Sequence, residues 1–201
     1  MNILETVSLG KHLFRISKVL RDSLFLNSIL TNGETWYSVS KTNSDNLENV
    51  DKSLLRKILN TGRNTPIPLL YLELGCMRIE TILKYRRINF LHYIISTNNE
   101  KSLYKFFDTQ WRFPDKGDWT ETVKQDLTDF DIDFNVHDFR KTKTETFKKF
   151  LKLKANEFEL KYLSLQKSKL SKIRHLNFKK LELSNYLRLE DIGDDEAKTV
   201  F

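Results

Sequence analysis

Apolar residues recur every three or four positions along most of the chain, and this spacing places their side chains on one face of an α-helix. The longest such pattern lies within residues 69–97, near the middle of the sequence. Its apolar positions are Ile79, Ile82, Leu83, Ile88, Leu91, Ile94 and Ile95. The positions on the remaining face are occupied by the bases Arg78, Lys84, Arg86 and Arg87. We therefore predict a central amphipathic helix that begins near Met77, with a buried apolar face and a basic exterior.

The same spacing predicts helices on both sides of this central element. The predicted segments are residues 11–31, 47–59, 69–74, 100–111, 118–127, 138–165 and 181–189. Local signals mark several of their ends. The Asn32-Gly33 pair and Gly75 tolerate the left-handed backbone that ends a helix, whereas Ser44-Asp45 and Asp118 are predicted N-caps.

Together these segments predict an all-α fold, an elongated irregular helical bundle around the central helix. The composition agrees, because an apolar fraction of 39% and a charged fraction of 30% indicate much exposed surface. Only FDIDFNV, residues 130–136, alternates apolar and polar positions in the manner of a strand. We interpret this segment as a connecting loop, because no partner strand is evident, and a short strand is the alternative.

Charge is unevenly distributed along the chain, whose net charge is +7. Residues 140–180 contain fourteen lysines and arginines against three glutamates, whereas residues 108–138 contain nine acids against three bases. A polyanionic partner would bind to the basic segment, residues 140–180. We therefore predict a helical core over residues 1–113, an acidic connector over 114–136 and a basic helical extension over 137–201.

Sequence motifs of catalysis are absent. The chain has no glycine-rich phosphate loop, no GxSxG elbow and no HExxH pair. Cys76 lies beside Gly75, where a helix start would lower its pKa, but a lone cysteine in an apolar run is interpreted as a packing residue. The four histidines share no metal-ligand spacing: His12, His92, His137 and His175. We expect no enzymatic activity and no cofactor.

Three acids alternate with apolar residues at Asp129, Asp131 and Asp133. Carboxylates at this spacing would bind Mg²⁺ if all three converged on one ion. The alternative, which we favour, is a half-buried edge on which the acids are solvated or pair with downstream lysines.

The basic segment carries interleaved aromatic residues. They are Phe139, Phe147, Phe150, Phe158, Tyr162 and Phe178. Lysines bind phosphates with release of counterions, and exposed rings stack on unpaired bases. Since the rings lie largely at helical spacing, most of them are expected in the core, and a basic solvated helix face is an equal alternative to nucleic-acid binding.

No window of the sequence approaches the apolar length of a membrane span, and no apolar signal segment occurs at residues 1–14. A single cysteine points to a reducing compartment. We expect an intracellular protein of the cytoplasm or nucleus with no membrane association.

Six phrases, in order, resemble the region that follows the catalytic palm in reverse transcriptases of non-LTR (LINE-type) retrotransposons. They are MNILETVSLGKH (1–12), LRDSLFLNSILTNGETWY (20–37), VDKSLLRKIL (50–59), TPIPLLYLELGCMRI (65–79), KYRRINFLHYII (84–95), and KFFDTQW with PDKGDWTETVKQDL (105–127). The resemblance covers nearly the whole chain and includes no catalytic signature.

The resemblance implies a thumb-like helical core with a helical extension that grips a primer–template or the element's own RNA. The paired aspartates of the palm, the endonuclease residues and the Cys/His cluster of such polyproteins are missing. We therefore expect a non-enzymatic fragment, from a truncated or decayed reading frame, whose partners are RNA or DNA and other parts of the parent polyprotein. The expected binding residues are Arg86, Arg87, Lys141, Lys143, Lys148, Lys149, Lys152 and Lys154. The alternative is a domesticated helical interaction or scaffold protein that docks a protein partner through Leu103–Trp119.

Overall fold

The computed structural model describes residues 14–37, 39–97, 101–113 and 115–166. Every regular element within these ranges is a helix, and they contain no strand, so the predicted all-α fold is confirmed. No helix in the described ranges has the length and apolar character needed to cross a membrane.

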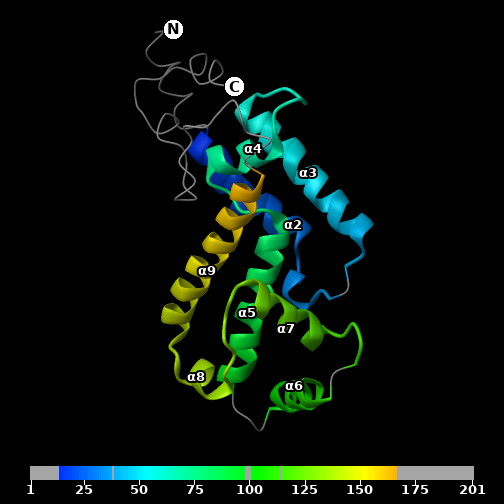
Figure 1. Ribbon diagram of the computed structural model, residues 1–201, viewed down its shortest axis with the longest axis vertical. Coiled ribbons are helices and arrows are strands. Elements are labelled where there is room, and N and C mark those ends of the chain that lie inside the picture. The colour runs from blue at the N-terminus through cyan, green and yellow to red at the C-terminus, as the bar shows by residue number, and fades with distance from the viewer. Residues whose placement is uncertain (1–13, 38, 98–100, 114, 167–201) are drawn as a thin grey trace. The chain divides into compact units, whose positions relative to one another are not determined.

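The helices follow one another along the chain with short connections (Figure 1). Their bounds are η1 Arg21–Phe25, α2 Leu26–Ile29, η2 Gly33–Thr35, α3 Lys41–Leu59, α4 Ile67–Leu74, α5 Ile79–Ser96, α6 Ser102–Arg112, α7 Trp119–Asp129, α8 Val136–Lys141 and α9 Thr144–Leu165. η1 is a π-helix that continues helical backbone from residues 14–20, and η2 is a 3-10 helix. The predicted helix over residues 181–189 lies outside the described residues.

The described chain forms two compact units. The first comprises residues 14–31, 45–78 and 159–166, and the second comprises residues 32–44 and 79–158 with the gaps given above. Both α3 and α9 begin in the second unit and end in the first. These units do not coincide with the predicted boundaries after residues 113 and 136, because helices distant in sequence pack together.

The core of the first unit is built around the short helix α4, whose residues 68–74 are all buried. Leu70, Leu72 and Leu74 pack there with leucines of α3 and with Leu163 of α9. Gly75 ends the helix in the left-handed region at φ 57°, as predicted. Lys18 donates hydrogen bonds to the two carbonyl oxygens at this end, those of Leu74 and Gly75.

Of two helix boundaries predicted from local capping residues, one is confirmed and one is wrong. Asn32 adopts a left-handed backbone at φ 55° after the first helix, as predicted. The predicted start of α3 at Ser44-Asp45 is wrong, because the helix begins at Lys41. Ser40 accepts a hydrogen bond from the backbone N–H of Asn43 at 3.2 Å, so an earlier polar residue performs the N-cap role.

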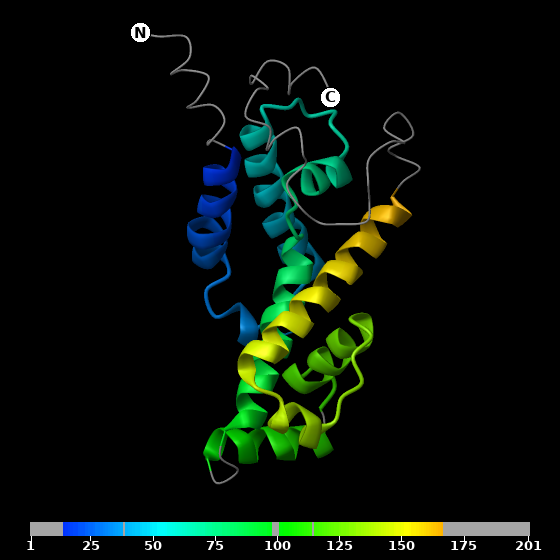
Figure 2. The ribbon, with the colours of Figure 1, turned by 90° about the vertical axis from the view of Figure 1, so that its left-hand side faces the viewer.

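α5 is the central helix of the second unit and packs against η2, α6, α7 and α8 (Figures 1 and 2). Six of its seven predicted apolar residues are buried and Ile82 is half-buried, but three of the four bases predicted on its exterior are buried as well. Lys84 is only 9% exposed and Arg87 only 7%. Arg78, just before the helix, is 7% exposed within the first unit, where it pairs with Glu159 at 3.0 Å. These bases are buried because carboxylates of other helices face them.

The segment 114–136, predicted as an acidic connector, contains helix α7 and the loop that follows it. Asp118 caps α7 by accepting a hydrogen bond from the backbone N–H of Glu121 at 2.8 Å, as predicted. α7 then packs on α5 and contributes Val123 and Leu127 to the core. Its acids alternate with these buried residues, so a segment with an acidic composition is part of the helical core.

Candidate nucleic-acid interface

A groove of about 440 Å³ in the second unit brings together two of the predicted binding residues, Arg86 of α5 and Lys148 of α9. Asn89 and Thr144 add polar groups to its lining, and Glu34 is its carboxylate. α5 and the first turns of α9 meet at this groove through the stacked rings of His92 and Phe147. Two cations therefore lie beside hydrogen-bonding groups that suit an anionic ligand.

One wall of the groove is aromatic. Phe90 and Tyr93 of α5 stack with their ring planes 14° apart and their centroids 6.0 Å apart. The rings of Trp119 and Phe90 meet edge to face with their centroids 5.8 Å apart, and the Trp119 indole N–H donates a hydrogen bond of 2.8 Å to the Glu34 carbonyl. Tyr93 itself is 58% exposed, so this wall presents an aromatic ring to solvent.

Exposed lysines continue from this groove along the chain. Lys141 ends α8, Lys143 immediately precedes α9, and the side chains of Lys148, Lys149 and Lys152 project from its first turns. All five lysines are exposed, and the last three share one side of α9 by their three- and four-residue spacing. Lys148 also lies 3.6 Å from the exposed carboxylate of Glu145. Five of the eight predicted residues are thus accessible to a polyanion.

Arg87 and Lys154, two further predicted binding residues, are held by acidic side chains and are less exposed than these five lysines. Arg87 is buried and forms a bidentate pair with Asp126, at 2.6 and 3.0 Å, which removes its side chain from the surface. Lys154 lies 3.6 Å from Asp131 and 3.5 Å from Glu157. Sequence reasoning placed both cations on a solvated face because their acidic partners lie on other turns or other helices.

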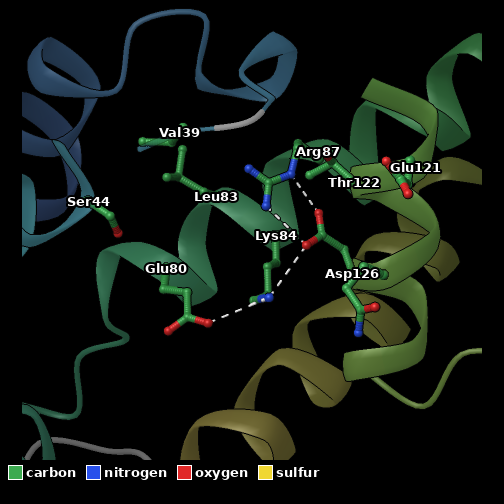
Figure 3. Close-up of a pocket in the computed structure, with 10 residues that line it drawn as sticks. Val39, Ser44, Glu80, Leu83, Lys84, Arg87, Glu121, Thr122 and Asp126 are labelled. Atoms are coloured by element: carbon green, nitrogen blue, oxygen red, sulfur yellow. Dashed lines mark hydrogen bonds and ion pairs between the residues drawn. The ribbon is translucent and has the colours of Figure 1, made fainter. Parts of the chain in front are cut away.

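Figure 3 shows the ion-pair cluster around Arg87, which lines a second groove of about 460 Å³. Lys84 Nζ lies 2.5 Å from Asp129, 3.5 Å from Asp126 and 3.5 Å from Glu80. Burial opposes the charge on Lys84, yet its pKa is raised because of the hydrogen bond to Asp129 and the nearby acids. Burial likewise opposes ionisation of Asp129, but hydrogen bonds from Lys84 and Gln125 lower its pKa.

This cluster was missed by the sequence analysis, although its signal is present. Lys84 and Arg87 are three positions apart on α5, and Asp126 and Asp129 are three positions apart on α7. Two helices that carry opposite charges at the same spacing can pair along one contact line. Lys84 and Arg87 balance the charges of Asp126 and Asp129, so the chemistry between the two helices is that of a structural ion pair.

The first unit contains a comparable buried network. Arg21 donates to both carboxylate oxygens of Asp51, each at 2.7 Å, and to the Met77 carbonyl at 3.0 Å. The Tyr71 hydroxyl lies 2.8 Å from Glu48 and 3.2 Å from Asp51. Burial raises the pKa of the Tyr71 hydroxyl, and the two adjacent carboxylates raise it further, so Tyr71 stays protonated and donates.

The acidic run at residues 129–133 has the alternation predicted for a half-buried edge. Phe130 and Ile132 are buried, whereas Asp131 and Asp133 are exposed. Residues 130–135 form a loop, as interpreted for the segment 130–136, and α8 begins at Val136. The pairing of Asp131 with Lys154 matches the predicted contact with a downstream lysine. Within the described ranges no group of three His, Cys, Asp or Glu residues is arranged to hold a metal ion.

Cys76 and two of the described aromatic residues of the basic segment are buried, and Phe158 and Tyr162 are half-buried. Cys76 is 2% exposed, and burial raises the pKa of its thiol, which agrees with a packing role. Phe139 and Phe147 are buried, whereas Phe150 is 41% exposed. Phe178, His12 and His175 lie outside the described residues.

His92 is a buried histidine at the base of the first groove. Its ring stacks on Phe147 with centroids 4.0 Å apart, and its Nε2 lies 3.1 Å from the Thr142 carbonyl oxygen. Burial lowers the pKa of His92 below 6.5, against the opposing effect of hydrogen bonds with the carbonyls of Thr142 and Phe139. The imidazole is therefore neutral in the folded protein at pH 7.

We expect His92 to make folding stability sensitive to acid. Between pH 6.5 and the lower native pKa, the unfolded chain binds a proton that the native chain does not, so stability falls as pH falls through this window. Chemical denaturation at several pH values should show a shallower pH dependence for His92→Gln than for the wild type. His137→Gln, an exposed position in α8, is the control and should keep the wild-type slope. Equal slopes for His92→Gln and the wild type would contradict this role.

Comparison with known proteins found no matching family model, no matching curated protein and no matching solved structure.

Proposed function

We propose that this chain binds RNA or DNA through the groove lined by Arg86 and Lys148 and through the adjoining exposed lysines, without catalysing a reaction. The observation that carries this proposal is the placement of two cations from distant parts of the sequence, residues 86 and 148, along one groove beside an exposed aromatic ring. Phosphates attract such cations, and release of condensed counterions drives the association.

The arrangement favours contacts to the nucleic-acid backbone. Lysines are compact charges on flexible stems, so Lys148, Lys149 and Lys152 suit phosphates at varying positions and read no base edge. Their spacing on α9 places them on the helix side that continues from the groove. Affinity is therefore expected to depend on salt more than on sequence.

Salt titration with a short single-stranded RNA tests the proposal. The double variant Arg86→Gln/Lys148→Gln should weaken binding, and the slope of log affinity against log salt should become shallower by about 1.4 if each cation contacts one phosphate. Fluorescence anisotropy at salt concentrations from about 50 to 200 mM measures this slope.

The matched control is Lys105→Gln/Lys116→Gln, which removes the same charge from exposed positions outside the groove. This control should keep the wild-type slope. An affinity that does not fall with salt, or that is absent below millimolar protein, would overturn the proposal. An equal effect of both double variants would show that net charge alone attracts the RNA.

We further propose that the chain corresponds to the region after the palm of a non-LTR retrotransposon reverse transcriptase. The support is the order of the six phrases over residues 1–127 and an all-α fold that suits a thumb with a helical extension. Sequencing the flanking locus tests this ancestry, because an upstream frame that contains a paired-aspartate motif would support it. An upstream frame that encodes an unrelated protein would contradict it.

A protein-docking role is the second candidate function. It is favoured by three exposed apolar residues at α6 and its end: Leu103 at 39%, Phe106 at 62% and Phe113 at 77%. Exposed apolar side chains gathered on one short segment are common at protein interfaces. Self-association that is lost on replacing Phe106 by lysine would support this role, and a monomer by sedimentation would count against it.

A further inference from the structure

We propose that Tyr93 is a stacking platform for one unpaired base, which makes the groove selective for single-stranded nucleic acid over duplex. This inference rests on the proposed function and adds the substrate class. Its starting point is the 58% exposure of a tyrosine that lines the groove with Arg86 and Lys148.

The platform is supported by a chain of aromatic contacts. Phe90 lies beside Tyr93 with the two rings nearly parallel and their centroids 6.0 Å apart, and the rings of Phe90 and Trp119 meet edge to face. The hydrogen bond from Trp119 to the Glu34 carbonyl fixes the indole in turn. Because these contacts hold the exposed Tyr93 ring at the groove, a base can stack on it at little cost in side-chain entropy.

The neighbouring cations explain why the ligand is a nucleotide strand and not an isolated aromatic molecule. Arg86 and Lys148 line the same groove as Tyr93, so a base stacked on the ring would lie with its phosphate near a cation. In a duplex the bases are paired and stacked on one another, and none is presented to such a ring. A duplex would contact the lysines alone.

The other exposed aromatic residues described in the second unit, Tyr37, Phe106, Phe113 and Phe150, do not line the groove. Phe106 is 62% exposed on α6, but it does not line the groove. Phe150 is 41% exposed on α9, and its ring centroid lies 6.4 Å from that of Phe147. It does not line the groove either. Tyr93 is therefore the aromatic side chain that the structure assigns to base stacking.

The test compares a fluorescent 12-nucleotide oligo(dT) with a 12-base-pair DNA duplex on the full chain by anisotropy. Tyr93→Ala should weaken binding of the single strand by about 5- to 150-fold and leave the slope of affinity against salt unchanged. Duplex affinity should change less than about twofold, because backbone contacts to lysines are retained. Tyr93→Leu, which keeps an apolar side chain without an aromatic face, should show the same selective loss, and Tyr93→Trp should retain single-strand binding.

Phe106→Ala is the matched control and should leave both affinities unchanged. Equal weakening of single strand and duplex by Tyr93→Ala, or no weakening of either, would overturn the stacking role while the salt-dependent binding of the wild type still supported the proposed function. If the wild type bound neither ligand, both the stacking role and the proposed function would be wrong.

Discussion

Replacing Asp126 by alanine is expected to lower the free energy of unfolding of the second unit by about 3–5 kcal/mol. Asp126 is 1% exposed and accepts both hydrogen bonds of the Arg87 pair, and it also lies 3.5 Å from Lys84. Its removal leaves the Arg87 guanidinium buried without its bidentate partner. When a buried cation loses its partner, its desolvation cost is no longer compensated. The resulting loss of stability is several times larger than the loss caused by breaking a surface ion pair.

Urea denaturation followed by tryptophan fluorescence measures this effect directly. Trp36, Trp111 and Trp119 are the three tryptophans of the sequence, and all lie in the second unit. Asp133→Ala, at an exposed position of the loop after α7, should change stability by less than about 0.5 kcal/mol. A loss for Asp126→Ala no greater than that of this control would show that the buried pair contributes little.

Replacing Asp51 by alanine should destabilise the first unit by a similar amount, about 3–5 kcal/mol. Arg21 is 1% exposed and Asp51 is fully buried, and the two form a bidentate pair. The change also removes one of the two acceptors near the Tyr71 hydroxyl. Far-UV circular dichroism during urea denaturation follows the loss of helix.

Asp22 provides a matched control for Asp51, because both carboxylates contact the same guanidinium. The Asp22 side chain is 46% exposed and lies 2.8 Å from Arg21 Nη1, so Asp22→Ala should cost no more than about 1 kcal/mol. Joint replacement Arg21→Met/Asp51→Leu should recover much of the stability lost in Asp51→Ala, because no unpaired charge remains. Equal costs for the Asp22 and Asp51 variants would contradict the importance of burial.

The helices themselves were largely predictable from local sequence. A helix requires apolar residues three and four positions apart, and its ends depend on nearby caps, so Asp118 and Gly75 were recognised from the chain alone. Where two polar residues competed for a cap, as Ser40 did with Ser44, the local rule chose the wrong one. The groove was less predictable, since Arg86 and Lys148 were named separately and nothing in the sequence joined them with Tyr93.

The sequence by itself determined that this protein is helical, where most helices lie and which segment carries the cations, because periodicity, caps and charge act over a few residues. Only the tertiary structure decided which cationic side chains are exposed to solvent and which are buried in ion pairs. Arg87 and Lys148 have similar helical settings, yet Arg87 meets a carboxylate 39 residues away and is buried, whereas the Lys148 side chain is exposed beside a groove. A charge is solvated or paired according to the helix that faces it, and that choice is made by long-range packing.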